Sequence, residues 1–163
     1  VKIVPLQLPL SRCQPQEKAH DEVQAELQRE IDLMWSFRHD NIVNFITAFR
    51  NPVASEVWVV MELCSLGSLF AIVEQLGPLI DVEVEAVLHP MLCGLRYLHE
   101  QRYTIHRDIK AGNVLLTGDA EVKLADFGVA TSTDGHGMQH TIIGTPHWMA
   151  PEVITGGGHD WRA

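Results

Sequence analysis

The stretch at residues 106–116, HRDIKAGNVLL, constrains the fold of this 163-residue chain more than any other. Five charged or hydrogen-bonding side chains fall within its first eight positions, directly before an apolar run at 114–116. This pattern follows neither the two-residue alternation of a half-buried strand nor the 3.6-residue repeat of an amphipathic helix. We therefore predict a tight loop that leads into a short buried strand, with polar side chains that serve chemistry rather than packing.

The N-terminal part of the chain shows the periodicity of strands with one helix. A proline-containing linker precedes a stretch at 18–37 in which apolar residues recur at helical spacing. Two β-rich segments follow at 42–49 and 57–61, and an Asn-Pro turn separates them. The sequence predicts one helix and a β-hairpin here.

The C-terminal part is predicted to be mainly helical. Helices are expected at 69–75 and 82–101, and a second hairpin pairs 114–116 with 121–124. The longer helix should direct one apolar face inwards, formed by Val84, Val87, Leu88, Met91, Leu95 and Leu98. Strands with one helix, followed by helices with small hairpins, predict an α+β fold of two unequal lobes.

Composition excludes several classes of function. The chain carries 12 basic and 21 acidic side chains, a formal charge of −9, whereas nucleic acids and anionic membranes need a positive surface. Its three cysteines are widely spaced and form no CxxC pair, which argues against a disulfide framework or a zinc site. No apolar run approaches the length of a membrane span. We expect a protein of a reducing compartment, the cytoplasm, without nucleic-acid partners.

The polar residues of the loop fit phosphoryl transfer. Asp108, Lys110 and Asn113 would place an acceptor, a cation and a neutral metal ligand in one small volume. Asp126 follows the second hairpin, which should fold it back beside Asn113. One carboxylate and one amide, completed by phosphate and water oxygens, suit Mg²⁺ better than Zn²⁺ or Ca²⁺.

With these residues in place, the sequence resembles the eukaryotic protein kinases. His106-Arg107-Asp108 with Lys110 and Asn113 matches the catalytic loop, and the motifs at 126–128 (DFG) and 150–152 (APE) follow in the family order. The resemblance implies a two-lobed protein kinase-like fold, partial at both ends, with a small β-rich N-lobe containing one helix and a mostly helical C-lobe. Residues 1–163 would form one kinase domain fragment, with 1–63 as an N-lobe part lacking the glycine-rich loop and 64–163 as a C-lobe part ending after the APE motif.

The resemblance implies ATP and Mg²⁺ as cofactors and gives each loop residue a role. Asp108 would accept and orient the substrate hydroxyl, and Lys110 would steady the γ-phosphate. Asn113 and Asp126 would bind Mg²⁺. The catalytic set is thus Asp108, Lys110 and Asn113.

A second group of residues would hold ATP itself. The resemblance implies that Lys2 contacts the α and β phosphates, that Met61 borders the adenine, and that Glu62 to Cys64 offer backbone groups to the base. Glu30 lies on the apolar stripe of the first helix, where a carboxylate either leans towards water or has a cationic partner. In the family that partner is the lysine, here Lys2. Met61 is also compatible with plain core packing.

A third group would regulate activity. Lys110 and the stretch GTPHWMAPE at 144–152 resemble serine/threonine kinases of the sterile-twenty group and of mitogen-activated cascades. Thr141 aligns with their activating phosphosite, and a phosphate there could pair with Arg107. An upstream kinase or autophosphorylation in trans would add it. The alternative is a plain hydroxyl in a loop.

Two further positions follow from the same resemblance. Phe127 would stack with His106, Met34 and Phe45 in the internal column of active kinases, although ordinary core packing explains these residues as well. Glu152 would normally be paired inside the C-lobe, with a partner that this sequence does not contain.

The function implied is ATP-dependent phosphoryl transfer to serine or threonine hydroxyls of proteins, as in a signalling kinase. The alternative is a non-catalytic kinase-like binding or regulatory module, either a scaffold or a truncated product. We expect the fragment to be inactive by itself.

Overall fold

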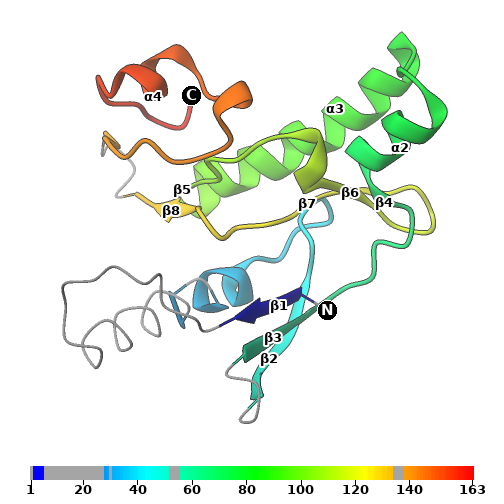
Figure 1. Cartoon of the computed structure of the whole chain (residues 1–163), viewed down its shortest axis with the longest axis horizontal. Helices are drawn as coiled ribbons and strands as arrows, with labels where there is room; N and C mark the ends of the chain where they lie inside the picture. Colours follow the sequence, from blue (N-terminus) through cyan, green and yellow to red (C-terminus); the bar gives the residue numbers. More distant parts are fainter. Residues whose placement is uncertain (1, 6–27, 30, 52–55, 134–137) are drawn as a thin grey trace. The chain divides into compact units, whose positions relative to one another are not determined.

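The computed structural model describes residues 2–5, 28–29, 31–51, 56–133 and 138–163. The chain forms two compact units. The first contains Val1–Arg38 and Asn44–Glu62, and the second contains His39–Val43 and Leu63–Ala163. Figure 1 labels the helices and strands of both.

The first unit is built on a three-stranded antiparallel sheet. Its strands are β1 (Lys2–Pro5), β2 (Phe45–Asn51) and β3 (Glu56–Met61), in the order β1-β3-β2. The hairpin predicted for β2 and β3 is confirmed by their antiparallel register. The first of the two strands begins later than the predicted residue 42, because Ile42 pairs in parallel with Leu124 instead.

A helical segment contributes to the core of this unit. Residues 28–29 and 31–36 are helical, whereas 18–27 and 30 of the predicted helix lie outside the described residues. Met34 and Phe37 are buried, as are Phe45 and the alternating β3 residues Val57 and Val59. This two-residue alternation is what a sheet with one covered face requires.

Two helices begin the second unit. Helix α2 (Leu69–Leu76) is N-capped by Ser68, whose side-chain oxygen accepts a hydrogen bond from the Ala71 amide. Helix α3 (Asp81–Arg96) continues into a π-helical turn (Tyr97–Gln101). The helices predicted at 69–75 and 82–101 are confirmed. Within the second, the π-helical pattern, in which residues five apart are hydrogen-bonded, is confined to the last five residues.

Part of the inward face predicted for α3 is wrong. Val87 and Leu98 are buried, but Val84 is 38% exposed and Leu88 is 48% exposed. Successive helical residues are rotated by about 100°, so residues seven or eleven positions apart point within about 20° of each other. Val87, Gly94 and Leu98 therefore share the buried direction, whereas Val84 and Leu88 lie about 60° and 100° around the helix from Val87.

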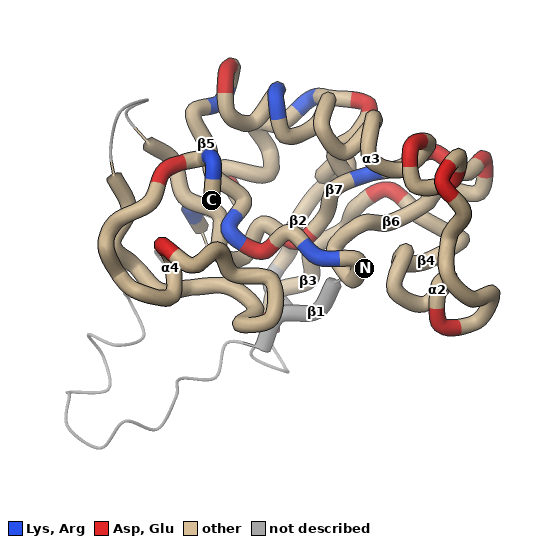
Figure 2. Tube along the Cα trace, turned by 90° about the horizontal axis from the view of Figure 1, so that it is seen from above, with Lys and Arg blue, Asp and Glu red and all other residues tan. Residues whose placement is uncertain are grey.

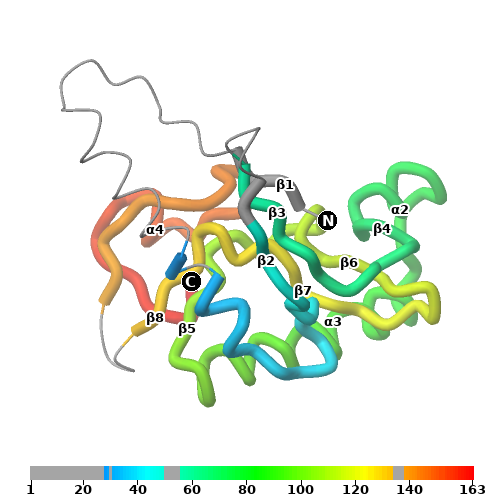
Figure 3. Tube along the Cα trace, turned by 90° about the horizontal axis from the view of Figure 1, so that it is seen from below, coloured from blue at the N-terminus to red at the C-terminus, as the bar shows by residue number. Residues whose placement is uncertain are grey.

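Short strands carry the remaining framework of the second unit. A three-stranded sheet has the order β4-β6-β7, formed by Gly67–Ser68, Val114–Leu116 and Val122–Leu124. The second hairpin is confirmed: β6 and β7 are antiparallel and lie side by side in Figure 3. A separate pair joins β5 (Thr104–Ile105) to β8 (Thr131–Ser132).

The segment His39–Val43 fixes the position of β7. The Leu124 amide donates to the Asn41 carbonyl (2.9 Å), and the Val43 amide donates to the Leu124 carbonyl (2.9 Å). A Cβ atom at Gly94 would lie 3.0 Å from the same Asn41 carbonyl, so α3 approaches this segment closely where it has no side chain. The same Cβ atom would lie 3.1 Å from Leu124 Cδ1. The end of β7, which leads to Asp126, is therefore in contact with both the His39–Val43 segment and α3.

The last elements are short. A 3₁₀ turn (Pro146–Trp148) precedes α4 (Pro151–Thr155), which ends at Gly156 in a left-handed conformation (φ 68°). Acidic residues gather at the α2–α3 end of the second unit in Figure 2. Within the described ranges, no helix is both long enough and apolar enough to cross a membrane.

Candidate active site

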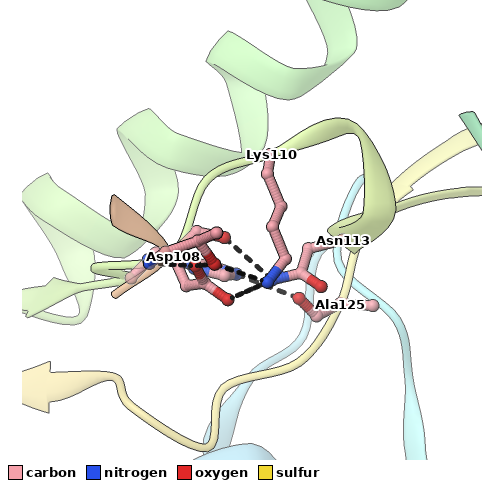
Figure 4. A network of polar contacts seen from close by, with 6 residues as sticks. Asp108, Lys110, Asn113 and Ala125 are labelled. Carbon is pink, nitrogen blue, oxygen red and sulfur yellow. Dashed lines mark hydrogen bonds and ion pairs between the residues drawn. The ribbon is translucent and has the colours of Figure 1, made fainter. Parts of the chain in front are cut away.

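The polar loop closes on itself as predicted. Lys110 precedes a 3₁₀ turn (Ala111–Asn113) that leads into β6, and the Asn113 amide donates to the Lys110 carbonyl (2.9 Å). Lys110 Nζ lies 2.7 Å from Asp108 Oδ2, and Asn113 Nδ2 donates to the same oxygen (2.9 Å) and to the Asp108 carbonyl (2.8 Å). Figure 4 shows this network. Of the three side chains predicted for catalysis, Lys110 and Asn113 therefore both contact the Asp108 carboxylate.

Thr145 completes the network, and sequence reasoning gave it no role. Its backbone amide (3.0 Å) and its hydroxyl (2.5 Å) both donate to Asp108 Oδ1, and its Oγ1 accepts from Lys110 Nζ (2.7 Å). The available signal was its place in the motif at 144–152, but 37 residues separate it from Asp108. Each carboxylate oxygen of Asp108 thus has two polar contacts.

These contacts set the charge of Asp108. Its burial alone would raise its pKa, but hydrogen bonds from Lys110, Thr145 and Asn113, together with the Lys110 charge, outweigh that effect. The net result is an Asp108 pKa below the usual value. The group is an ionised and weakly basic carboxylate at neutral pH, suited to orienting a hydroxyl more than to deprotonating it in advance.

His106 ties the loop to the residues that follow β7. Its ring is 1% exposed, its Nε2 lies 3.0 Å from the Ala125 carbonyl, and its Nδ1 accepts from the Asp108 amide (3.4 Å). An accepting Nδ1 means a neutral ring with its proton on Nε2. Burial lowers the pKa of His106 even though the charges of Asp108 and Asp126 oppose the shift, which agrees with that neutral form.

The same backbone connection brings Asp126 to Asn113. The Ala125 amide donates to the Asn113 carbonyl (2.9 Å), so Asp126 follows one residue after this bond. Asp126 is exposed and has a left-handed backbone (φ 64°), an unfavourable conformation for a non-glycine residue that recurs at functional sites. Phe127 is buried against His106, with ring centroids 5.0 Å apart.

The side-chain oxygens of Asn113 and Asp126 are ligands of the kind that Mg²⁺ prefers. The Asn113 side-chain nitrogen faces Asp108, which leaves its carbonyl oxygen as the atom able to bind a metal, and Asp126 supplies a carboxylate. Among the residues that the structure describes, no three His, Cys, Asp or Glu side chains gather as a metal site. An ion here would complete its shell with phosphate and water oxygens, the usual arrangement for Mg²⁺.

Arg107 contacts the segment that carries Thr141. Arg107 has φ 65°, its Nε donates to the Val129 carbonyl (2.5 Å), and its Nη1 donates to Thr141 Oγ1 (3.1 Å). A Cβ atom at Gly144 would lie 2.5 Å from the Arg107 carbonyl, and Gly144 has φ 131°. Arg107 and Thr141 are therefore close together, as predicted, and are joined by a hydrogen bond from the guanidinium to the threonine hydroxyl.

The residues expected to hold ATP are described unevenly. Met61 is the last residue of β3 and pairs with Phe45 of β2. The Glu62 amide donates a hydrogen bond to the Asn44 carbonyl (2.9 Å), and Glu62 Oε1 accepts one from the Asn44 amide (2.5 Å). The Cys64 carbonyl accepts from the Gly67 amide (3.1 Å). The predicted contact between the Lys2 side chain and Glu30 lies outside the described residues.

Glu152 lies in the first turn of α4 and is exposed. Its carbonyl accepts from the Thr155 hydroxyl (3.3 Å). The buried pairing expected for this side chain stays a prediction.

Comparison with known proteins decides the family. The family model described as "Protein kinase domain" matches residues 11–162. The chain belongs to the protein kinase family. The kinase resemblance and the partial kinase fold predicted from the sequence are confirmed.

Curated relatives place this kinase chain more closely. It is 46% identical over 141 residues to serine/threonine-protein kinase cst-1 of Caenorhabditis briggsae, covering 85% of this chain and 28% of that protein. It is 43% identical over 158 residues to serine/threonine-protein kinase dst3 of Dictyostelium discoideum (94% and 28%), and 44% identical over 134 residues to pakB of the same organism (80% and 15%). The chain thus spans less than a third of each of these relatives. The protein kinase family generally uses ATP and Mg²⁺ and acts on protein substrates.

Proposed function

We propose that this kinase transfers the γ-phosphoryl group of ATP to serine or threonine hydroxyls of protein substrates. The observation that carries the proposal is the Asp108 carboxylate, which is ionised and held by Lys110, Asn113 and Thr145 in one orientation. Phosphoryl transfer depends mainly on positioning and charge stabilisation, which such a fixed carboxylate supplies. The names of the relatives, serine/threonine-protein kinases, support the choice of acceptor.

Asp108 acts on the substrate hydroxyl. It would accept a hydrogen bond from the hydroxyl, aim the oxygen at the γ-phosphorus, and take the proton as the new P–O bond forms and the bond from the γ-phosphorus to the leaving ADP breaks. Its lowered pKa makes it a poor base towards a free alcohol, so the proton moves late, when the attacking oxygen has become acidic. The main contribution of Asp108 is orientation.

Lys110 and Thr145 adjust the charge beside the hydroxyl. The Lys110 ammonium contacts Asp108 and Thr145, and it would steady the γ-phosphate of bound ATP through its positive charge. When bound, Mg²⁺ and ATP supply the charge neutralisation and the phosphoryl group. Asn113 and Asp126 would hold the metal ion through their side-chain oxygens.

We propose the remaining ATP contacts by analogy with the family. Lys2, oriented by Glu30, would hold the α and β phosphates, and Met61 would border the adenine. Backbone groups between Glu62 and Cys64 would recognise the base. The Glu62 amide already donates to the Asn44 carbonyl, so another amide of this stretch would donate to the base. The Cys64 carbonyl accepts one bond from the Gly67 amide and has a second lone pair.

Thr141 is proposed as the activating phosphosite, modified by an upstream kinase or by a second copy in trans. Arg107 already donates to its hydroxyl, so a phosphate would place about −1.5 to −2 charges against this guanidinium. The charged pair would be stronger than the present neutral hydrogen bond.

The test is Asp108→Asn in the full-length protein, with Mg²⁺-ATP and a serine-containing protein substrate. The expected loss of kcat is about 10²–10⁴-fold, the usual contribution of a positioned proton acceptor. Asp119→Asn, in the exposed turn between β6 and β7, is the matched control and should keep wild-type activity. Undiminished transfer by Asp108→Asn would overturn the role of Asp108. A wild-type protein that binds ATP without any transfer would favour the binding-module alternative.

A further inference from the structure

The segment that carries Thr141 is attached on both sides. On one side the Arg107 guanidinium donates to the Thr141 hydroxyl. On the other, Gln139 and His159 form an antiparallel bridge in which each amide donates to the opposite carbonyl, at 2.8 Å in both directions. In Figure 1 the chain before Thr141 (orange) runs beside the C-terminal stretch (red) that contains this bridge.

Gly158 makes the bridge possible. Its backbone has φ 92°, which side-chain-bearing residues rarely adopt. A Cβ atom there would lie 2.9 Å from His140 Cε1 and 3.1 Å from Met138 Cε, so the residues on either side of Gln139 pack directly on this glycine. His159 is 5% exposed, and the bridge therefore rests on a buried residue. The backbone conformation therefore favours glycine at this position, and a side chain there would have to displace the His140 ring and the end of the Met138 side chain.

The bridge restricts where Thr141 can be. Two residues of extended chain span at most about 7 Å, so fixing Gln139 confines Thr141 to a small volume. Arg107 lies in that volume. Without the bridge, Gln139 would lose its two backbone hydrogen bonds to His159, and Thr141 would no longer be confined in this way.

We propose that Gln139, Gly158 and His159 form a clasp that positions Thr141 against Arg107 before any phosphate is added. These are positioning residues, because they act through the segment and touch no reacting atom. The inference rests on the proposed kinase function and on Thr141 as its phosphosite. Phosphorylation then strengthens a contact that already exists, and the clasp determines how much activity the unphosphorylated enzyme has.

The clasp has a matched pair of test variants. Gly158→Ala places a side chain at φ 92° and against His140, whereas Gly157→Ala adds a Cβ whose nearest neighbour, Thr155 Oγ1, is 3.9 Å away. A second pair acts on the other strand: Gln139→Pro removes the amide that donates to His159, and Gln139→Ala keeps it. The second pair keeps the test valid if Gly158→Ala does not fold.

The measurements use the full-length protein after phosphatase treatment. Hydrogen exchange of peptides that cover 138–145 should be about tenfold faster in Gly158→Ala than in Gly157→Ala, since positive φ disfavours an L-residue by about that factor. Exchange should also be faster in Gln139→Pro than in Gln139→Ala, because proline cannot donate the hydrogen bond to the His159 carbonyl. Transfer activity should fall severalfold in the unphosphorylated clasp variants. It should recover towards wild type once Thr141 is phosphorylated, and purely structural damage would not produce this recovery.

Two results would overturn the clasp. One is an exchange rate in Gly158→Ala equal to that of Gly157→Ala, and the other is an equal loss of activity with and without the phosphate. Hydrogen exchange requires no catalysis, so protection of 138–145 in a protein that transfers no phosphate would refute the proposed function and leave the clasp in place. Rapid, unprotected exchange of 138–145 in an enzyme that transfers phosphate would refute the clasp and leave the proposed function in place.

Discussion

Replacing Thr145 with valine removes one hydroxyl and nearly preserves the shape of the side chain. That hydroxyl donates to Asp108 Oδ1 and accepts from Lys110 Nζ, so two hydrogen bonds to charged groups are lost. Each such bond contributes about 1.5–3 kcal/mol. The Thr145 amide still donates to Asp108, which limits the total to about 3 kcal/mol, or roughly 10²-fold in kcat/KM.

The assay compares Thr145→Val with Thr145→Ser in steady-state phosphorylation of a serine peptide. Serine keeps the hydroxyl and should retain most of the activity. Thr145 is one of the groups that lower the pKa of Asp108, so the acidic limb of the pH–rate profile should move to higher pH in the valine variant. A valine variant within threefold of wild type, or a serine variant as impaired as the valine one, would refute the reasoning.

Three other predictions follow from local contacts. Thr141→Ala should lower activity at least about tenfold, because Arg107 then has no phosphate with which to pair. Thr141→Ser keeps a hydroxyl that can be phosphorylated and should retain activity. Equal activity of the two variants would contradict the phosphosite. Gly144→Ala should reduce the free energy of unfolding by about 2 kcal/mol, because the new Cβ would clash with the Arg107 carbonyl and the backbone has a positive φ. Thermal denaturation measures this effect, and an unchanged melting temperature would be the contrary result. Burial lowers the pKa of His99 against the effect of Glu100, so the unfolded state binds protons more readily and stability should fall as the pH drops below about 6.5. His99→Phe should flatten that pH dependence, and an unaltered curve would exclude His99 as a source.

The sequence was sufficient for structure that depends on near neighbours. Asp108, Lys110 and Asn113 lie within six positions, so any tight loop brings them together, and the loop-to-strand transition at Val114 was readable from the apolar run. The β6–β7 hairpin has a five-residue connection, and its pairing follows from turn chemistry and alternation. Local spacing determines such features because few other conformations satisfy it.

Only the tertiary structure decided the features that depend on distant segments. Which side of α3 is buried depends on β7 and on Asn41, and periodicity alone placed the face too far towards Val84 and Leu88. Thr145 reaches Asp108 across 37 residues, a contact that no local spacing encodes. The sequence by itself thus determined the chemistry of the loop and the family to which it points. The fold decided how the second carboxylate oxygen of Asp108 is held, because Thr145, one of the groups that lower the Asp108 pKa, reaches that oxygen only through long-range packing.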